Sequence, residues 1–147
     1  MTVNVTIEQM TVEDLDEVLS IERASFGTPW SKGAFHYELK KNRVARCWVA
    51  RGAVVPEPVI VGYLCLWEIG PEIHITNLAV HPGWRRQGVA RALLGVTMED
   101  ARRRHLRLAI LRCDPPTWRR WGSMRASVFE SSVAGRGTTL TPGRTPW

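Results

Sequence analysis

The chain has 147 residues, of which 44% are hydrophobic, and it carries a net charge of +6 at pH 7. This size and composition suit one globular domain with a substantial core. A membrane span would need about 18 consecutive apolar residues, and no such run is present. The first residues also lack the charged and apolar regions of a signal peptide, so we expect a cytoplasmic protein with no membrane partner.

The cysteines and the charge narrow the class of ligand. Cys47, Cys65 and Cys113 have neither CxxC nor metal-ligand spacing, and the first two lie in strand-like apolar runs. This pattern favours buried free thiols over a disulfide or a zinc site, and we predict no metal. The positive charge would suit a nucleic acid or an acidic small molecule. Because no nucleic-acid-binding motif is present, we favour a nucleotide cofactor.

The first half of the chain predicts a strand, two helices and a second strand. Val and Ile alternate with polar residues over 3–7, which favours a strand. Thr11 and the acidic residues after it resemble a helix cap, and the helix should stop near Gly27. Ser31 is placed to cap a second helix, and residues 46–51 suit a short strand. Four residues of the first helix follow at helical spacing, and the last of them is acidic: Leu15, Val18, Leu19 and Glu22.

The second half begins with two long apolar runs, 59–69 and 73–80, which a Gly-Pro pair separates. They predict an antiparallel pair of strands. An amphipathic helix over about 87–104 ends in basic residues that suit a helix C-terminus, and 106–111 suits a further strand. From residue 112 the chain is rich in Trp, Pro, Gly, Arg, Ser and Thr without any period, which predicts a disordered tail.

The turn after the second apolar run carries the most specific signal. Residues 81–90 read His-Pro-Gly-Trp-Arg-Arg-Gln-Gly-Val-Ala, so a strand breaks at a turn that opens a helix. Such a turn aims free backbone N–H groups and the positive helix end at one point. Gly88 and Ala90 keep Cβ bulk away from an approaching diphosphate. We predict a phosphorylated cofactor here, with Arg85 and Arg86 beside its phosphates.

These residues resemble those of the GNAT acetyltransferases. Residues 85–90 are similar to the family's acetyl-CoA pyrophosphate loop, Gln/Arg-x-x-Gly-x-Gly/Ala. Residues 77–82, Asn-Leu-Ala-Val-His-Pro, and 25–31, Ser-Phe-Gly-Thr-Pro-Trp-Ser, are similar to its RimI-like branch, which acetylates the N-terminal alanine of a ribosomal protein. The resemblance covers roughly residues 3–111. It implies an α/β GNAT fold, with a mixed, mostly antiparallel sheet and helices on both faces.

The resemblance also implies a cofactor, acetyl-CoA, and a set of residues that bind it. Backbone amides around Leu78, Ala79 and Val80 would bond the pantetheine arm and face the thioester carbonyl. The pyrophosphate would lie against the residues of the loop: Arg85, Arg86, Gln87, Gly88, Val89 and Ala90. The acceptor, the N-terminus of a ribosomal protein, would lie against a wall that includes Phe26, Pro29 and Trp30. Trp30 is equally suited to the core.

The chain departs from the family where the catalytic residues are expected. After the strand at 106–111 the RimI-like pattern continues Leu-Glu-Val-Arg-Pro-Ser-Asn, then Ala-Leu-x-Leu-Tyr-x-x-x-Gly-Phe, with the Glu as proposed base and the Tyr as proposed acid. Residues 112–118 here read Arg-Cys-Asp-Pro-Pro-Thr-Trp, and neither catalytic residue is present. Glu68 and His74, on the two central strands, are weak substitutes for the base, because such residues more often only face solvent.

A change of reading frame explains this departure. Read from the third base, codons for 112–118 allow Val-Arg-Pro-Ser-Asn-Leu, and those for 124–129 and 138–142 allow Leu-Tyr-Ala-Ser-Leu-Gly-Phe and Tyr-Tyr-Thr-Asp-Pro. Three family motifs thus recur in order and at family spacing. We predict a GNAT domain over 1–111 and an out-of-frame or disordered tail over 112–147, with the fold's C-terminal part absent or non-native.

The function that this resemblance implies is transfer of an acetyl group from acetyl-CoA to a protein N-terminal α-amino group. Two alternatives stay open. The chain would be an acetyl-CoA-binding remnant with impaired catalysis if the missing Glu and Tyr are not replaced. It would be a small-amine acetyltransferase if the acceptor is not a peptide.

Overall fold

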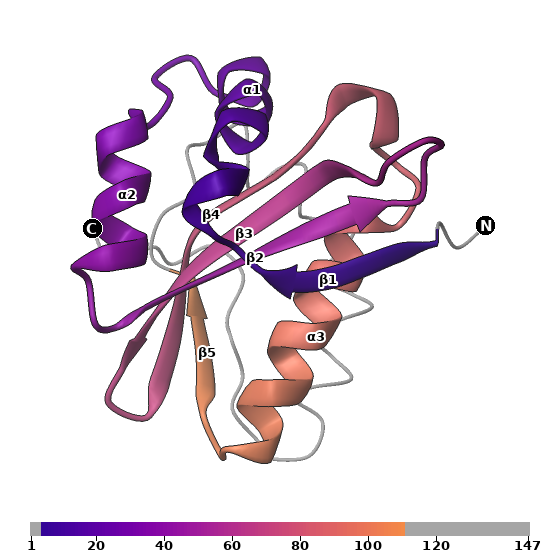
Figure 1. Cartoon of the computed structure of the whole chain (residues 1–147). Helices are drawn as coiled ribbons and strands as arrows, with labels where there is room; N and C mark the ends of the chain where they lie inside the picture. The colour runs from indigo at the N-terminus through magenta and orange to yellow at the C-terminus, as the bar shows by residue number, and fades with distance from the viewer. Residues whose placement is uncertain (1–3, 111–147) are drawn as a thin grey trace.

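The computed structural model describes residues 4–110, and Figure 1 shows their arrangement. The predicted tail at 112–147, with its proposed change of frame, lies outside the described residues. Five strands and three α-helices follow the chain order β1 (Val5–Gln9), α1 (Leu15–Ser25), α2 (Lys32–Lys40), β2 (Ala45–Gly52), β3 (Val59–Ile69), β4 (Glu72–Val80), α3 (Val89–Arg103) and β5 (Arg107–Ile110). Short 3-10 turns, Val12–Asp14 and Pro82–Trp84, precede α1 and follow β4.

The strands form one sheet in the order β1-β2-β3-β4-β5. The pairs from β1 to β4 are antiparallel, and β4 pairs with β5 in parallel from Glu72 to Ile75. The predicted α/β class with a mixed, mostly antiparallel sheet is therefore confirmed. The first strand extends two residues beyond its predicted end at residue 7, because Val5–Gln9 is the segment that pairs with β2.

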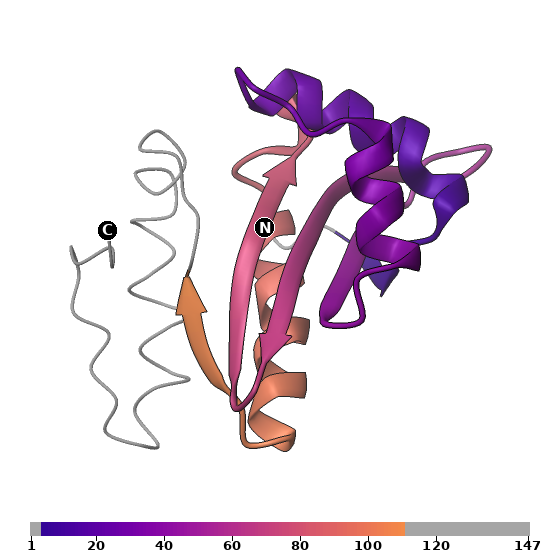
Figure 2. The same ribbon diagram turned by 90° about the vertical axis from the view of Figure 1, so that its left-hand side faces the viewer.

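Helices cover both faces of the sheet, as predicted (Figure 2). The helix α3 packs on one face, where Leu93 and Leu94 meet apolar residues such as Leu64 and Ile75. The helices α1 and α2 pack on the other, where the core includes Phe35. We call these the α3 face and the α1/α2 face.

Both predicted helix caps are present. The backbone N–H of Thr11 donates to Asp14 Oδ2 at 2.8 Å ahead of α1, and Ser31 Oγ accepts from the backbone N–H of Ala34 at 3.1 Å at the start of α2. These bonds satisfy N–H groups that the first turn leaves without an intrahelical acceptor. The Thr11 bond lies at the start of the 3-10 turn, whereas α1 itself has Asp14 as N-cap without a side-chain capping bond. The Ser31 bond fixes where α2 begins, and therefore where the connection between α1 and α2 ends.

We expect Ser31→Ala to lower the free energy of unfolding by about 1 kcal/mol, because the Ala34 N–H loses its acceptor. Urea unfolding followed by circular dichroism measures the change. Ser20→Ala, within α1, is the control and should be near neutral, since alanine favours a helix interior. Equal effects of the two substitutions would contradict the capping role of Ser31.

A β-bulge interrupts the pairing of β3 with β4. Cys65 is paired with Asn77 and Leu66 with Ile75, so Thr76 is the extra residue, and its hydroxyl donates to the Cys65 carbonyl at 3.2 Å. A bulge re-aims the side chains that follow it. Here Asn77 is directed to the α1/α2 face, while Ile75 lies in the core of the α3 face.

The two described cysteines are both buried and free, as predicted, and they lie opposite each other on β2 and β3. Among residues 4–110, no cluster of three or more His, Cys, Asp or Glu side chains could hold a metal ion. None of the described helices is long and apolar enough to span a membrane.

Candidate active site

The turn between β4 and α3 has a tightly determined backbone. His81 Nδ1 accepts from the Gly83 N–H at 3.0 Å, and the Trp84 N–H donates to the His81 carbonyl at 2.8 Å. Two residues then adopt the left-handed region, Arg86 with φ of 61° and Gly88 with φ of 88°. Gly88 is the N-cap of α3, so the helix begins at Val89 and not at 87 as predicted.

The role of Gly88 is conformational. A Cβ placed on Gly88 would meet nothing within 4 Å, so the described chain leaves the space at this position open. Its φ is instead one that residues with a side chain rarely adopt. This conformation lets the chain turn directly into α3, whose first amides have no intrahelical acceptor. The donors at the start of α3 therefore face outward beside the positive end of the helix dipole.

The two arginines of the loop differ in their surroundings. Arg85 donates from Nε to the Val80 carbonyl at 2.9 Å and from Nη2 to Ser25 Oγ at 3.1 Å. It therefore connects the end of β4 to the end of α1. Arg86 and Gln87 are exposed, whereas Val89 is buried and anchors the first turn of α3 in the core.

Gly62 allows α3 to approach the sheet closely beside this turn. A Cβ there would lie 3.0 Å from Val89 Cγ1, 3.1 Å from the Ala79 carbonyl oxygen and 3.3 Å from Leu93 Cδ1. Any side chain would therefore push the start of α3 away from β4. The spacing between the Leu78–Val80 backbone and the helix N-terminus depends on this glycine.

The proposed acceptor residues lie in the connection between α1 and α2, residues 26–31, which we call the acceptor segment. Phe26 and Trp30 are half-buried, and Pro29 is exposed. The Trp30 ring lies 5.2 Å from the Phe35 ring, centroid to centroid, so Trp30 has a packing role beside any contact with substrate. Its backbone N–H donates to Glu22 Oε1 at 2.8 Å.

Sequence reasoning did not identify Glu22, Tyr63 and Asn77 as a group. Glu22 on α1 is 1% exposed and accepts hydrogen bonds from the Tyr63 hydroxyl and from Asn77 Nδ2 as well as from Trp30. Burial raises the pKa of Glu22, although the bonds from Trp30 and Asn77 act in the opposite direction. One sequence signal could have drawn attention to Glu22: it is an acidic residue at a position of α1 where the helical spacing otherwise places apolar side chains.

His74 lies on the α1/α2 face, because its neighbours Ile73 and Ile75 point into the core of the α3 face. His74 Nε2 lies 2.9 Å from Glu72 Oε2, and His74 Nδ1 is buried without a hydrogen-bond partner among the described residues. If the proton sits on Nε2, where it bonds Glu72, then Nδ1 carries a free lone pair.

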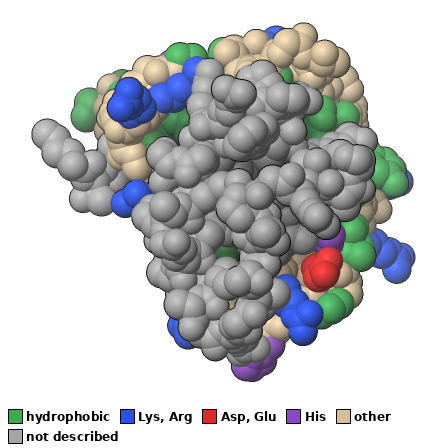
Figure 3. Space-filling view, turned by 180° about the vertical axis from the view of Figure 1, so that it is seen from behind, with side chains coloured by type: hydrophobic (Ala, Val, Ile, Leu, Met, Phe, Trp, Pro, Cys, Tyr) green, Lys and Arg blue, Asp and Glu red, His purple; other side chains and the backbone are tan. Residues whose placement is uncertain are grey.

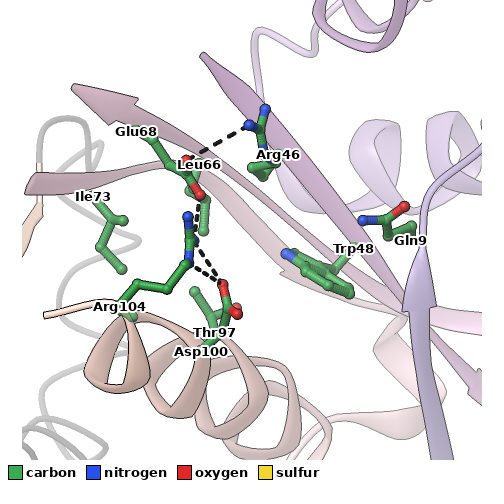
Figure 4. Close-up of a pocket in the computed structure, with 10 residues that line it drawn as sticks. Gln9, Arg46, Trp48, Leu66, Glu68, Ile73, Thr97, Asp100 and Arg104 are labelled. Atoms are coloured by element: carbon green, nitrogen blue, oxygen red, sulfur yellow. Dashed lines mark hydrogen bonds and ion pairs between the residues drawn. The ribbon is translucent and has the colours of Figure 1, made fainter. Parts of the chain in front are cut away.

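Glu68 lies in a different environment, which Figure 4 shows. It lines a cavity of about 150 Å³ on the α3 face, where Arg104 Nη2 donates to it at 2.5 Å and Arg46 Nη2 lies 3.7 Å away. The hydrogen bond from Arg104 holds the pKa of Glu68 below its ordinary value of 4.5. A carboxylate held in this way is a weaker base, so this environment does not favour Glu68 for proton transfer.

We expect Glu68→Gln to lower the free energy of unfolding at pH 7 by up to about 1 kcal/mol. The folded-state pKa of Glu68 is depressed, so its contribution is present above the unfolded-state pKa and is lost as pH falls through the folded value. The difference between wild type and variant should therefore shrink below about pH 4.5. Urea unfolding from pH 3 to pH 7, with exposed Glu57→Gln as control, tests this, and a pH-independent difference would contradict it.

Figure 3 views the molecule from behind. On the described surface left visible there, Lys and Arg side chains stand at separate places around the rim, with an acidic and a His side chain between some of them. The positive charge of the visible surface is therefore dispersed. The prediction that the protein does not bind nucleic acid directly stays a prediction.

Comparison with known proteins assigns the class. The family profile named Acetyltransferase (GNAT) family matches residues 15–120, and the chain belongs to this family of acetyl-CoA-dependent N-acetyltransferases. A Bacillus subtilis (strain 168) protein, described as a candidate ribosomal protein bS18-alanine N-acetyltransferase, is 31% identical over 115 residues, which are 75% of this chain and 74% of that protein.

Solved structures of related fold have lower sequence identity. The ribosomal-protein-S18-alanine N-acetyltransferase of Escherichia coli has a TM-score of 0.64 and 20% identity, and the match covers 82% of this chain and 76% of the Escherichia coli chain. An aminoglycoside acetyltransferase from an uncultured soil metagenomic sample has a TM-score of 0.60 and 18% identity, and the match covers 95% of this chain and 94% of that protein. At these identities the likeness shows the fold, and it confirms the predicted GNAT fold.

Proposed function

We propose that the protein transfers an acetyl group from acetyl-CoA to the N-terminal α-amino group of a protein, with a ribosomal protein that begins with alanine as the acceptor. The observation that carries the choice of acceptor is the 31% identity to the Bacillus subtilis protein over three-quarters of the chain. A ribosomal acceptor would place the reaction in the cytoplasm. We also propose that residues 1–111 form the acetyltransferase domain.

The residues of the β4–α3 turn fit the cofactor of the family. The left-handed Gly88 and the outward-facing amides at the start of α3 form a donor set suited to a diphosphate. In this proposal the loop from Arg85 to Ala90 holds the pyrophosphate, and the backbone of Leu78, Ala79 and Val80 holds the pantetheine arm. When bound, acetyl-CoA supplies the activated acetyl thioester.

The chain's own residues would then position the acceptor and handle the proton. The acceptor segment orients the peptide so that its amine reaches the end of β4, and this positioning supplies much of the rate. Backbone donors near Leu78 stabilise negative charge that develops on the carbonyl oxygen. His74 is kept as the candidate that accepts the ammonium proton, which requires that peptide binding exposes its buried Nδ1. No described residue is assigned as the acid.

Calorimetry with acetyl-CoA, together with an acetylation assay on an Ala-starting ribosomal peptide, tests the proposal. Binding and peptide acetylation are expected. Binding without turnover would favour the impaired remnant, for which the absent family Glu and Tyr at the matching positions are the supporting observation. Turnover on small amines but not on the peptide would favour a small-amine enzyme. If His74→Gln and Glu68→Gln both acetylate the peptide at the wild-type rate, the base is another residue.

The proposed change of frame has a separate test. Resequencing the locus should reveal a lost base near the codon of Arg112. A clean in-frame read, together with detection of the peptide Ala-Ser-Val-Phe-Glu from residues 126–130 by mass spectrometry of native cells, would contradict it.

A further inference from the structure

One carboxylate lies at the junction of the acceptor segment and the proposed cofactor strand. The Glu22 side chain leaves α1 on its buried side and divides its oxygens between two directions. Oε1 accepts from the Trp30 backbone N–H in the acceptor segment at 2.8 Å. Oε2 accepts from Asn77 Nδ2 on β4 at 3.0 Å and from the Tyr63 hydroxyl on β3.

None of these three donors to Glu22 is a cation. A carboxylate that is 1% exposed and has only neutral donors among residues 4–110 is expensive to bury, which is consistent with the raised pKa of Glu22. An apolar side chain would fill the same space without this expense. The arrangement is therefore better explained by what the carboxylate orients than by its contribution to stability.

Glu22 orients two parts of the proposed site. Asn77 immediately precedes Leu78, where the backbone would meet the thioester, and it follows the bulge at Thr76. Trp30 contacts the core through Phe35, and Phe26 of the same segment packs against the same cluster. Glu22 thus connects, through single hydrogen bonds, the segment that would hold the peptide to the strand that would hold the acyl group.

We propose that Glu22 is a positioning residue that sets the acceptor segment against β4 and thereby supports peptide binding. This inference rests on the proposed function, since it takes residues 26–31 as the acceptor wall. Glu22 itself is buried behind Trp30 and Asn77, so it acts through them.

Glu38 on α2 provides a matched control. It is 8% exposed and accepts hydrogen bonds from Trp67 Nε1 at 2.6 Å and from Asn42 Nδ2 at 3.1 Å. It is also a buried carboxylate that joins a helix to the same face of the sheet. Its partners lie outside the acceptor segment and away from the β4–α3 turn, so Glu38→Gln reproduces the loss of a buried charge without the proposed connection.

The experiment compares wild type, Glu22→Gln and Glu38→Gln in two measurements on the full chain. Amide hydrogen exchange of residues 26–31 reports the order of the acceptor segment without any need for activity. Calorimetry in the presence of CoA reports the affinity for an Ala-starting peptide. Loss of a hydrogen bond to a buried charged group predicts peptide binding about tenfold weaker in Glu22→Gln, with faster exchange at 26–31. Glu38→Gln should change neither quantity.

A double variant, Glu22→Gln with Asn77→Asp, separates positioning from general destabilisation. The amide and the carboxylate exchange places, so the bond between α1 and β4 is restored with its donor reversed. Peptide affinity should recover at least in part, although the fold now carries two substitutions. Affinity that falls further in the double variant than in Glu22→Gln would contradict the proposal.

The outcomes separate this inference from the proposed function. If the wild type binds no peptide, the proposed acceptor is wrong, and the exchange rates at 26–31 still decide whether Glu22 orders the segment. If the wild type binds peptide and Glu22→Gln binds it equally well, Glu22 has no positioning role. Unchanged exchange at 26–31 in Glu22→Gln would likewise overturn the inference.

Discussion

Gly88→Val is expected to bind acetyl-CoA at least about tenfold more weakly than the wild type. Gly88 has φ of 88°, and a side chain in this left-handed conformation costs roughly 1–2 kcal/mol per residue, with β-branched residues the least tolerant. The turn would relieve that strain by rotating its peptide groups. Rotation would move the amides that the proposal places around the pyrophosphate.

Calorimetry with acetyl-CoA measures the affinity, and thermal unfolding shows whether the variant is folded. Gly95→Ala is the control, because Gly95 is an exposed residue within α3 whose Cβ would meet nothing within 4 Å. It should leave the affinity unchanged and stabilise the chain by about 0.5–1 kcal/mol. If Gly88→Val binds as tightly as the wild type, the phosphate site lies elsewhere.

Phe35→Ala is expected to lower the free energy of unfolding by about 3–5 kcal/mol. Phe35 is fully buried, and its ring lies between the Trp30 ring at 5.2 Å and the Tyr63 ring at 5.6 Å, centroid to centroid. Its removal leaves a cavity between α2 and β3 that these rings cannot fill. Since a domain is stable by about 5–15 kcal/mol, the loss would be a large part of the total.

Urea unfolding followed by circular dichroism measures this effect. Tyr37→Ala on the same helix is the matched control, since Tyr37 is 56% exposed and its truncation should change stability by less than about 0.5 kcal/mol. Similar losses for the two variants would show that α2 packs on the sheet differently from the arrangement described above.

The elements of this fold are largely predictable from hydrophobic periodicity, whereas their edges are not. The run at 59–69 is long and apolar, and it coincides with β3. The start of α3 was placed two residues early, because sequence does not reveal that Gly88 is in the left-handed region and outside the helix. The β1 prediction missed Glu8 and Gln9 since polar residues on an edge strand resemble a loop.

The site was predictable only where its residues are local in sequence. The β4–α3 turn is a contiguous motif, so its arrangement of strand, turn and helix could be recognised. The hydrogen bond from Asn77 to Glu22 spans 55 positions, and the one from Arg104 to Glu68 spans 36. Neither partner could be inferred from spacing, and Glu68 therefore looked as suitable for a base as His74 did.

The bulge at Thr76 has a consequence for how β4 tolerates change. Because side chains alternate with a period of two, the extra residue puts the two halves of the strand out of phase. Before it, odd-numbered Ile73 and Ile75 point to the α3 face, whereas after it even-numbered Leu78 does so. Deletion of Thr76 would join Ile75 directly to Asn77 and restore plain alternation, so Asn77 and Leu78 would keep the faces they have now. The strand should therefore tolerate the loss of one residue at the bulge, whereas the loss of one residue elsewhere in β4 would turn the side chains on one side of the deletion to the opposite face.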